Sequence, residues 1–281
     1  MPYRIAVVGA GQMGSGIAQV AAAAGHDVLL NDRTEDLIAR GVAGIEKNLA
    51  RSVEKGRISA EDRTALLGRI RATPRIENLG VDLAIEAATE ALETKLELFR
   101  ALDAATPERA VLASNTSSIS ITLLGAATRR PGRTIGMHFM NPVPVMQLVE
   151  IIRGIATSQE TFDFTHALAA QMGKTPVEVR DFPGFVSNRV LMPMINEAIY
   201  ALYEGVGSVE AIDTVMKLGM NHPMGPLQLA DFIGLDTCLA IMNVLHDGFA
   251  DSKYRPCPLL RQYVAAGWYG KKTGRGFYTY A

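Results

Sequence analysis

The sequence predicts an α/β protein in which a doubly wound sheet is followed by an all-α C-terminal domain. In the first half of the chain, short runs of aliphatic and β-branched residues alternate with helical segments, the order that produces a largely parallel sheet. The sequence DFPG at residues 181–184 then breaks this alternation, and only helical apolar spacing follows it. We therefore predict two domains, residues 1–184 and residues 185–281.

Composition argues against a protein that binds nucleic acid or membranes. Of the 281 residues, 48% are hydrophobic and 20% are charged, and the formal net charge is -1. This balance gives no electrostatic attraction to either partner, and no apolar run reaches the length of a membrane span. Residues 1–4 (MPYR) lead directly into a strand, and Cys238 and Cys257 have no metal or redox spacing. We expect a cytoplasmic protein with reduced thiols, no leader segment and no metal ion.

The first predicted elements surround a glycine-rich turn. Residues 4–9 (RIAVVG) are typical of a buried strand, and residues 15–24 form a small-residue helix that ends at Gly25. In a strand–turn–helix unit, the first glycine permits the tight turn, the second lets a pyrophosphate approach the backbone, and the third lets helix and strand pack closely. The turn between these elements has that spacing, with the sequence Gly9-Ala10-Gly11-Gln12-Met13-Gly14.

An acidic residue completes this unit as a Rossmann-type dinucleotide site. The strand at residues 27–31 (DVLLN) is followed by Asp32, about 20 residues after the glycines, where a carboxylate accepts from ribose hydroxyls. A carboxylate also repels a 2′-phosphate, which favours NAD over NADP as the cofactor. Arg33 weakens that preference, because an adjacent arginine can pair with the phosphate.

Two amphipathic helices are predicted next, at residues 35–55 and 60–70. Arg51 and Lys55 lie four residues apart and therefore on one helical face. They are either part of a solvated face or contacts for a phosphorylated handle of the substrate.

Polar residues follow two further strands, at residues 82–87 and 110–114. Glu86 and Glu90 lie at the end of the first, and residues 115–118 (NTSS) follow the second. Open α/β sheets bind ligands at these ends, although small polar residues are also common turn formers and caps. The helix at residues 92–105, which carries Lys95, lies between the two strands in the sequence.

The next two strands suggest an acid/base pair. The runs at residues 134–139 and 147–152 read as strands joined by a proline-containing link, with His138 at the end of one and Glu150 inside the other. Adjacent strands would bring the side chains together as an imidazole oriented by a carboxylate. The alternative is a histidine near water and a glutamate on an edge strand.

The remaining segments are mainly helical. A helix at residues 160–172 and a strand at residues 176–179 complete the first domain. The second domain has apolar helical faces larger than a small domain hides alone, so we predict a homodimer through it. Its predicted helices are residues 187–204, 209–218, 226–232, 235–245 and 258–266.

Several ordered motifs together resemble the L-3-hydroxyacyl-CoA dehydrogenase family, especially its compact bacterial members that act on 3-hydroxybutyryl-CoA. The resemblance covers essentially the whole chain and implies a doubly wound NAD domain followed by a helical dimerisation domain. Besides the glycine motif and Asp32, the matching segments are SNTSS at 114–118, HFMNPVPVM at 138–146, LVE at 148–150, DFPGFVSNR at 181–189, HPMGP at 222–226 and GKKTGRGFY at 270–278.

The resemblance implies a role for individual residues. His138 matches the family's acid/base histidine and Glu150 its orienting carboxylate, while Ser117 and Asn188 match residues that hold the substrate oxygen. Lys55 looks like a basic residue near the CoA phosphates, and Arg51 on the same helix face is assigned to the substrate with it. The glycine turn is expected to contact NAD through Gly9, Gly11, Gln12, Met13 and Gly14. The other positions that match NAD contacts are Asp32, Glu90, Lys95, Ser117, Asn141 and Lys272.

The implied activity is the NAD-dependent interconversion of (S)-3-hydroxyacyl-CoA and 3-oxoacyl-CoA, with short acyl chains favoured. His138 would take or return the hydroxyl proton, which agrees with the chemistry expected of a histidine–carboxylate pair. Two alternatives remain: a dehydrogenase of small free 3-hydroxy acids, and a catalytically silent NAD-binding dimer.

Overall fold

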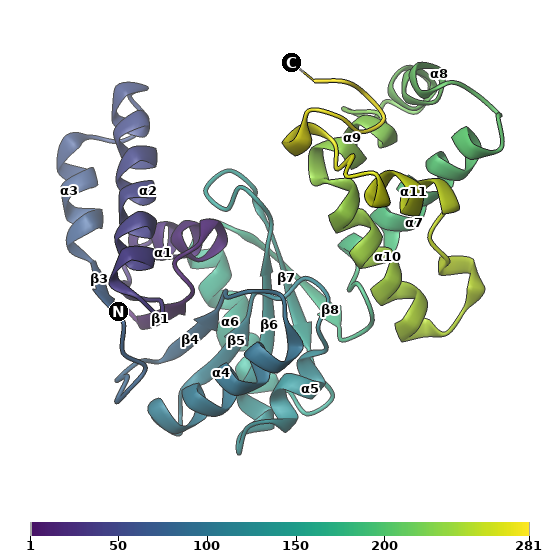
Figure 1. The fold of residues 1–281 in the computed structure, drawn as a ribbon. Coiled ribbons are helices and arrows are strands. Elements are labelled where there is room, and N and C mark those ends of the chain that lie inside the picture. The colour runs from purple at the N-terminus through teal and green to yellow at the C-terminus, as the bar shows by residue number, and fades with distance from the viewer. Residues whose placement is uncertain (1, 281) are drawn as a thin grey trace. The chain divides into compact units, whose positions relative to one another are not determined.

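An eight-stranded sheet forms the framework of the first part of the chain (Figure 1). The computed structural model describes residues 2–280. The strands lie in the order β3-β2-β1-β4-β5-β6-β7-β8, and neighbours are parallel except β6 and β7. Their bounds are β1 Arg4–Val8, β2 Asp27–Asn31, β3 Ile70–Thr73, β4 Leu83–Glu86, β5 Val111–Ser114, β6 Thr134–Phe139, β7 Leu148–Arg153 and β8 Thr175–Arg180.

The direction of strand addition reverses between β1 and β4. From β1 the chain adds β2 and β3 toward one edge, then returns to place β4 on the other side of β1 and continues to the opposite edge. In such sheets a ligand binds outside the carboxyl ends of the strands at this switch point. The predicted doubly wound sheet is confirmed.

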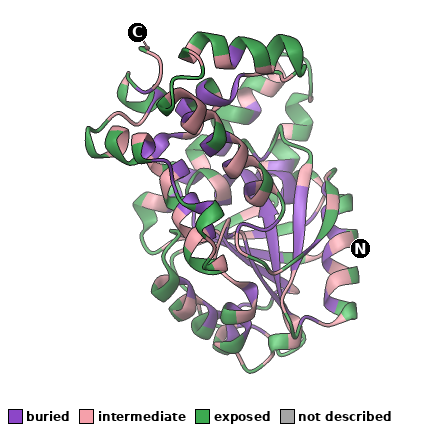
Figure 2. Ribbon diagram, turned by 90° about the vertical axis from the view of Figure 1, so that its right-hand side faces the viewer, coloured by how far each residue is buried: buried purple, intermediate pink, exposed green. Residues whose placement is uncertain are grey.

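Helices cover both faces of the sheet. Helices α1 (Gln12–Ala23) and α6 (Gln159–Gln171) share one apolar core, against which α2 (Glu35–Glu54) and α3 (Ala60–Gly68) also pack. In Figure 1, α6 lies behind the strands, whereas α4 (Leu92–Ala105) and α5 (Ile121–Ala126) lie in front of them. The central strands β1, β4, β5, β6 and β7 are largely buried between these layers, as the purple ribbons of Figure 2 show.

Side-chain alternation along the strands separates apolar from polar residues near the carboxyl ends of β4, β5 and β6. The residues that face the α1–α6 core are Ile85, Ala113, Met137 and Ile151. Because successive strand residues point to opposite faces, their neighbours face the other layer. Those neighbours are Glu86, Ser114, His138 and Glu150, and a Cβ on Gly136, which shares their face, would lie 3.0 Å from Ile121 Cδ1 of α5.

Two elements differ from the sequence prediction. The helix predicted at residues 60–70 ends at Gly68, and Ile70–Thr73 forms the edge strand β3. This strand lies at the edge of the sheet beside β2 and is half exposed. Its four residues are too few, and too exposed, to show an apolar pattern that predicts a strand. Helix α5 is also unpredicted, because its six residues are fewer than two helical turns.

The division between the two compact units falls between Asp181 and Phe182, whereas the sequence prediction placed it after Gly184. Hydrogen bonding accounts for this position. The Asp181 carboxylate accepts from Ser120 Oγ at 2.7 Å and from the amide of Thr122 at 2.8 Å, which ties it to the start of α5. Gly184, in contrast, accepts from the amide of Asn188 at the start of the next helix, at 3.1 Å.

The second unit is helical, as predicted, and has its own apolar core. Its helices are α7 Ser187–Tyr203, α8 Val209–Thr214, α9 Pro226–Ile233, α10 Leu235–Phe249 and α11 Pro258–Ala265. A π-helical turn at Val215–Gly219 continues α8, so the helix predicted at residues 209–218 changes its winding partway. Within residues 2–280, no single helix is long and apolar enough to cross a membrane, although the sharply bent pair α9 and α10 passes that test jointly.

Two buried aspartates accept hydrogen bonds from the last segment of this unit, residues 277–280. Asp231 accepts from the amides of Phe277 and Tyr278, both at 2.9 Å, and from the Tyr280 hydroxyl at 3.0 Å. Asp213 accepts from the Tyr278 hydroxyl at 2.8 Å. Burial, followed by hydrogen bonding to Asp213, raises the pKa of Tyr278 above its ordinary value. Residues 277–280 are therefore held by buried polar contacts as well as by apolar packing.

Candidate active site

The glycine turn has the geometry of a dinucleotide site. Gly9 adopts a φ of +109°, and a Cβ there would lie 2.5 Å from the carbonyl oxygen of Ala87. A Cβ on Gly14 would lie 1.7 Å from the carbonyl oxygen of Gly9, so only glycine permits this approach of strand and helix. A Cβ on Gly11 would meet no atom within 4 Å, which leaves room beside the N-terminus of α1 for phosphates.

Asp32 is fixed beside this turn. Its Oδ2 accepts from the amide of Ala10 at 2.8 Å, and its Oδ1 accepts from the amide of Arg33 at 2.7 Å. A cavity of about 770 Å³ opens over the turn and includes Asp32 and the apolar side chains of Leu37 and Ile76. The polar turn suits phosphates and ribose, and the apolar wall suits a flat base, so these residues fit NAD.

Gln12 and Asn141, both predicted to contact NAD, lie together. The Gln12 Nε2 donates to Asn141 Oδ1 at 3.0 Å, which connects the glycine turn to the link between β6 and β7. Lys174 holds the same link, because its ammonium donates to the carbonyl oxygens of Val143 and Met146. Burial lowers the pKa of Lys174 below its ordinary value.

His138 and Glu150 form the predicted pair. The antiparallel register places them directly opposite each other, and His138 Nδ1 lies 2.8 Å from Glu150 Oε2. Both are buried, with 8% and 2% of their surface exposed. A carboxylate only accepts hydrogen bonds, so this contact assigns a proton to Nδ1 and leaves Nε2 as the nitrogen that exchanges one.

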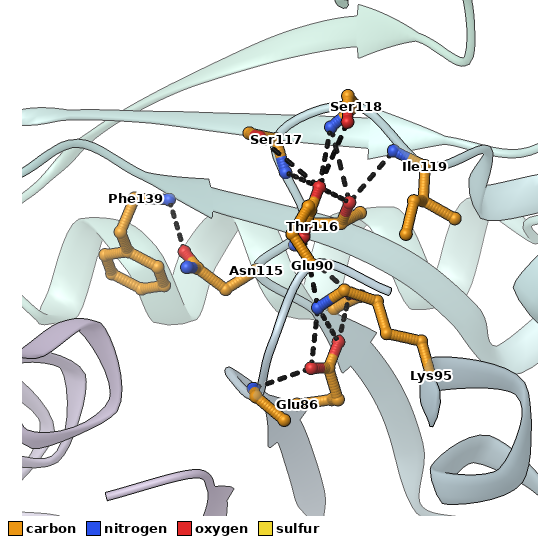
Figure 3. Close-up of polar contacts among 11 residues, drawn as sticks. Glu86, Glu90, Lys95, Asn115, Thr116, Ser117, Ser118, Ile119 and Phe139 are labelled. Atoms are coloured by element: carbon orange, nitrogen blue, oxygen red, sulfur yellow. Dashed lines mark hydrogen bonds and ion pairs between the residues drawn. The ribbon is translucent and has the colours of Figure 1, made fainter. Parts of the chain in front are cut away.

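Glu90 holds the turn that carries Ser117 (Figure 3). Its Oε1 accepts from the Thr116 hydroxyl at 2.5 Å and from the amides of Ser117 at 3.0 Å and Ser118 at 3.2 Å. Burial raises the pKa of Glu90, but the Lys95 ammonium, the Thr116 hydroxyl and the Ser117 amide together outweigh it and hold the pKa below its ordinary value. The turn is therefore organised around an ionised carboxylate.

Asn115 joins this turn to the histidine strand, a function that the sequence pattern did not reveal. Its side-chain Oδ1 accepts from the backbone amide of Phe139, next to His138, at 2.9 Å. Its backbone N–H donates to the carbonyl oxygen of Glu86 at 2.7 Å. The only sequence signal was its position after a strand, which Asn115 shares with ordinary turn residues.

A second cavity, of about 700 Å³, has a basic wall. Arg40, Lys47 and Arg51 line it from one face of α2, and the N-terminal part of α1 lies opposite. The structure thus places Arg51 on a groove that suits an anionic ligand. Lys55 is the exposed C-cap residue of α2 and does not line this cavity.

Asn188 and Lys272 belong to the second unit. Asn188 is buried in the first turn of α7, and Lys272 Nζ donates to Asp236 Oδ2 at 2.6 Å. Their roles in substrate and cofactor binding stay predictions. Among residues 2–280, no three or more His, Cys, Asp and Glu side chains are grouped as metal ligands.

Comparison with known proteins identifies the family. The sequence pattern of the 3-hydroxyacyl-CoA dehydrogenase NAD binding domain matches residues 4–182, and that of the C-terminal domain matches residues 184–280. The chain is 61% identical to the probable 3-hydroxybutyryl-CoA dehydrogenase of Bacillus subtilis, over 99% of this chain and 97% of that protein. It is 60% identical to the 3-hydroxybutyryl-CoA dehydrogenase of Bradyrhizobium diazoefficiens, over 99% and 95%.

A solved structure agrees with these relatives. The crystal structure of (S)-3-hydroxybutyryl-CoA dehydrogenase from Ralstonia eutropha is 50% identical, covers both chains fully and superposes with a TM-score of 0.98. The predicted NAD cofactor and the predicted resemblance are confirmed. The chain belongs to the 3-hydroxyacyl-CoA dehydrogenase family.

Proposed function

We propose that the protein interconverts (S)-3-hydroxybutyryl-CoA and acetoacetyl-CoA with His138 as the general acid/base. The observation that carries this proposal is the buried pair in which His138 Nδ1 lies 2.8 Å from Glu150 Oε2. By strand alternation this pair lies on the same face of the sheet as Glu86 and Ser114, and Ser114 leads into the serine turn, residues 115–118. The names of the Bacillus, Bradyrhizobium and Ralstonia relatives support the four-carbon substrate.

The residues of the site transfer the proton of the substrate's 3-hydroxyl group and bind its 3-oxygen. NAD held by the glycine turn and Asp32 would supply the hydride acceptor for C3 in oxidation and the hydride donor in reduction. In oxidation His138 Nε2 accepts the hydroxyl proton, and Glu150 stabilises the resulting imidazolium across the Nδ1 contact. In reduction the imidazolium donates its Nε2 proton to the alkoxide oxygen that hydride addition leaves on C3, which gives the alcohol. Ser117 holds the 3-oxygen while charge develops there.

The basic groove favours a CoA ester over a free hydroxy acid. A small free acid offers one carboxylate, whereas CoA carries several phosphate charges on a long handle. The cations of Arg40, Lys47 and Arg51 on one helix face match the handle. A silent NAD-binding protein would not need the buried histidine pair.

The substrate class is tested by following NADH absorbance with acetoacetyl-CoA and with free acetoacetate. We expect rapid oxidation of NADH only with the CoA ester, because the groove binds its handle. Equal rates with free acetoacetate would favour a hydroxy-acid dehydrogenase. No turnover of either compound, with NADH binding intact, would favour the silent protein.

Neutralising the groove is a second test. Arg51→Gln and Lys47→Gln should each raise KM for acetoacetyl-CoA by up to about fivefold, since an exposed ion pair contributes ~0.2–1 kcal/mol. The KM for NADH should stay unchanged. Arg100→Gln, which removes an exposed cation of α4 outside the groove, is the matched control. An equal effect of all three variants would mean that the cations act only through net charge.

Removing the imidazole tests the acid/base assignment. His138→Gln should lower kcat by roughly 10²- to 10⁴-fold while NADH binding is kept, because the glycine turn is untouched. Glu150→Gln should also lower kcat and move the pH–rate profile toward lower pH, because the imidazolium loses its stabilising charge. The double variant should lose much less than the product of the single losses. Multiplicative losses would show that the two residues do not act as a pair.

We also propose that the second unit forms a homodimer. Large apolar side chains are exposed on it, with Val206 77% and Leu218 82% accessible. Sedimentation equilibrium at micromolar concentration should give twice the 30.3 kDa mass of one chain. Leu218→Glu places a charge on this exposed apolar surface and so tests whether the surface forms the dimer. Glu108→Lys in the first unit is the charge-changing control. A monomeric wild type would contradict the proposal.

A further inference from the structure

Lys95 is a buried lysine whose charge is fully matched by carboxylates (Figure 3). Only 1% of it is exposed. Its Nζ lies 2.7 and 2.9 Å from the two carboxylate oxygens of Glu86, and 3.3 Å from Glu90 Oε2. These three oxygens equal the number of its N–H donors. The ammonium therefore has a full set of hydrogen-bond acceptors within the protein.

Glu90 divides its two oxygens between this lysine and the serine turn. Oε2 faces Lys95, while Oε1 accepts from the Thr116 hydroxyl and from the amides of Ser117 and Ser118. Any force that draws Glu90 toward the ammonium therefore competes with the donors of the turn.

Glu86 reaches the same turn by a second route. It is fully buried at the end of β4, and its Oε2 accepts from Ser114 Oγ at 2.6 Å. The Ser114 hydroxyl in turn accepts from the amide of Thr116 at 3.1 Å. The two carboxylates and one ammonium carry a net single negative charge. Because Glu86 compensates Lys95, the remaining charge is available at Glu90 for the donors of the turn.

We infer that Glu86 and Lys95 are positioning residues that act through Glu90 to hold Ser117 in its working place. The inference rests on the proposed function, because Ser117 is proposed there to bind the 3-oxygen of the substrate. With Glu86 neutral, Glu90 is the remaining carboxylate beside the ammonium and is pulled from the turn. With Lys95 neutral, two carboxylates face each other without compensation, and Glu86 is left as a buried unpaired charge. Removal of both charges leaves Glu90 free to hold the turn.

The test compares Glu86→Gln, Lys95→Met and the double variant with the wild type. Hydrogen exchange of the amides of residues 115–119 reports the order of the turn, and steady-state kinetics report its consequence. We expect exchange to rise about tenfold or more in each single variant and to return toward the wild type in the double variant. The kcat with acetoacetyl-CoA should fall about tenfold in the single variants, below the ~10²-fold that a 1 Å misplacement can cause, and partly recover in the double variant.

Asp103→Asn is the matched structural control. It removes a buried carboxylate at the other end of the same helix α4, where Asp103 pairs with Arg130 Nε at 2.7 Å. This variant should lower Tm without faster exchange in residues 115–119 and without lower kcat. If Glu86→Gln lowers Tm and nothing else, its role is structural and the inference fails. The inference also fails if the double variant is no better than the single variants.

A second variant keeps the test decisive if Glu86→Gln does not fold. Thr116 Oγ1 donates to Glu90 and also accepts from the amides of Ser118 and Ile119, so exchange is here read at the Ser117 amide, which donates to Glu90 itself. Thr116→Val removes this hydroxyl and leaves the buried ion pair intact. It should reproduce the faster exchange and the lower kcat, and unchanged exchange would refute the inference. A wild type that does not reduce acetoacetyl-CoA would overturn the proposed function, whereas hydrogen exchange would still decide whether Glu86 and Lys95 order the turn.

Discussion

Alternation of side chains along neighbouring strands is the constraint on which the site depends. Ile85, Ala113 and Met137 face the core shared with α1 and α6. The residue after each of them is polar and faces α4 and α5 at the carboxyl edge of the sheet. One face is thus reserved for apolar packing and the other for proton and charge chemistry. A shift of one residue in any strand would exchange the two roles.

Much of this arrangement could be predicted because its signals are local. The glycine spacing and Asp32 lie within one strand–turn–helix–strand unit, so their contact follows from a single supersecondary motif. His138 and Glu150 are separated by 12 residues, and a short link between adjacent strands brings them into register. The family resemblance then supplied the chemical roles, which spacing alone left open.

The rest could not be predicted because its partners are distant or its pattern is too short. Ser114 meets Glu86 from 28 residues away, and nothing periodic in the sequence connects them. Lys95 lies on an amphipathic helix, where a buried lysine has the same spacing as an exposed one. The edge strand β3 has four residues, and the position of the domain boundary depends on the contact of Asp181 with α5.

The hydrogen bonds that Asp231 accepts from residues 277–280 affect when the second unit can pack during synthesis of the chain. The amide donor at Phe277 comes 46 residues later in the sequence than Asp231. Until the ribosome has added residues 277–280, Asp231 can be buried only as a carboxylate without these partners, which is costly. The helices α7 to α10 can form earlier, but the second unit reaches its final packing only when its last segment emerges. The first unit contains all its own strands and can complete its sheet while translation continues.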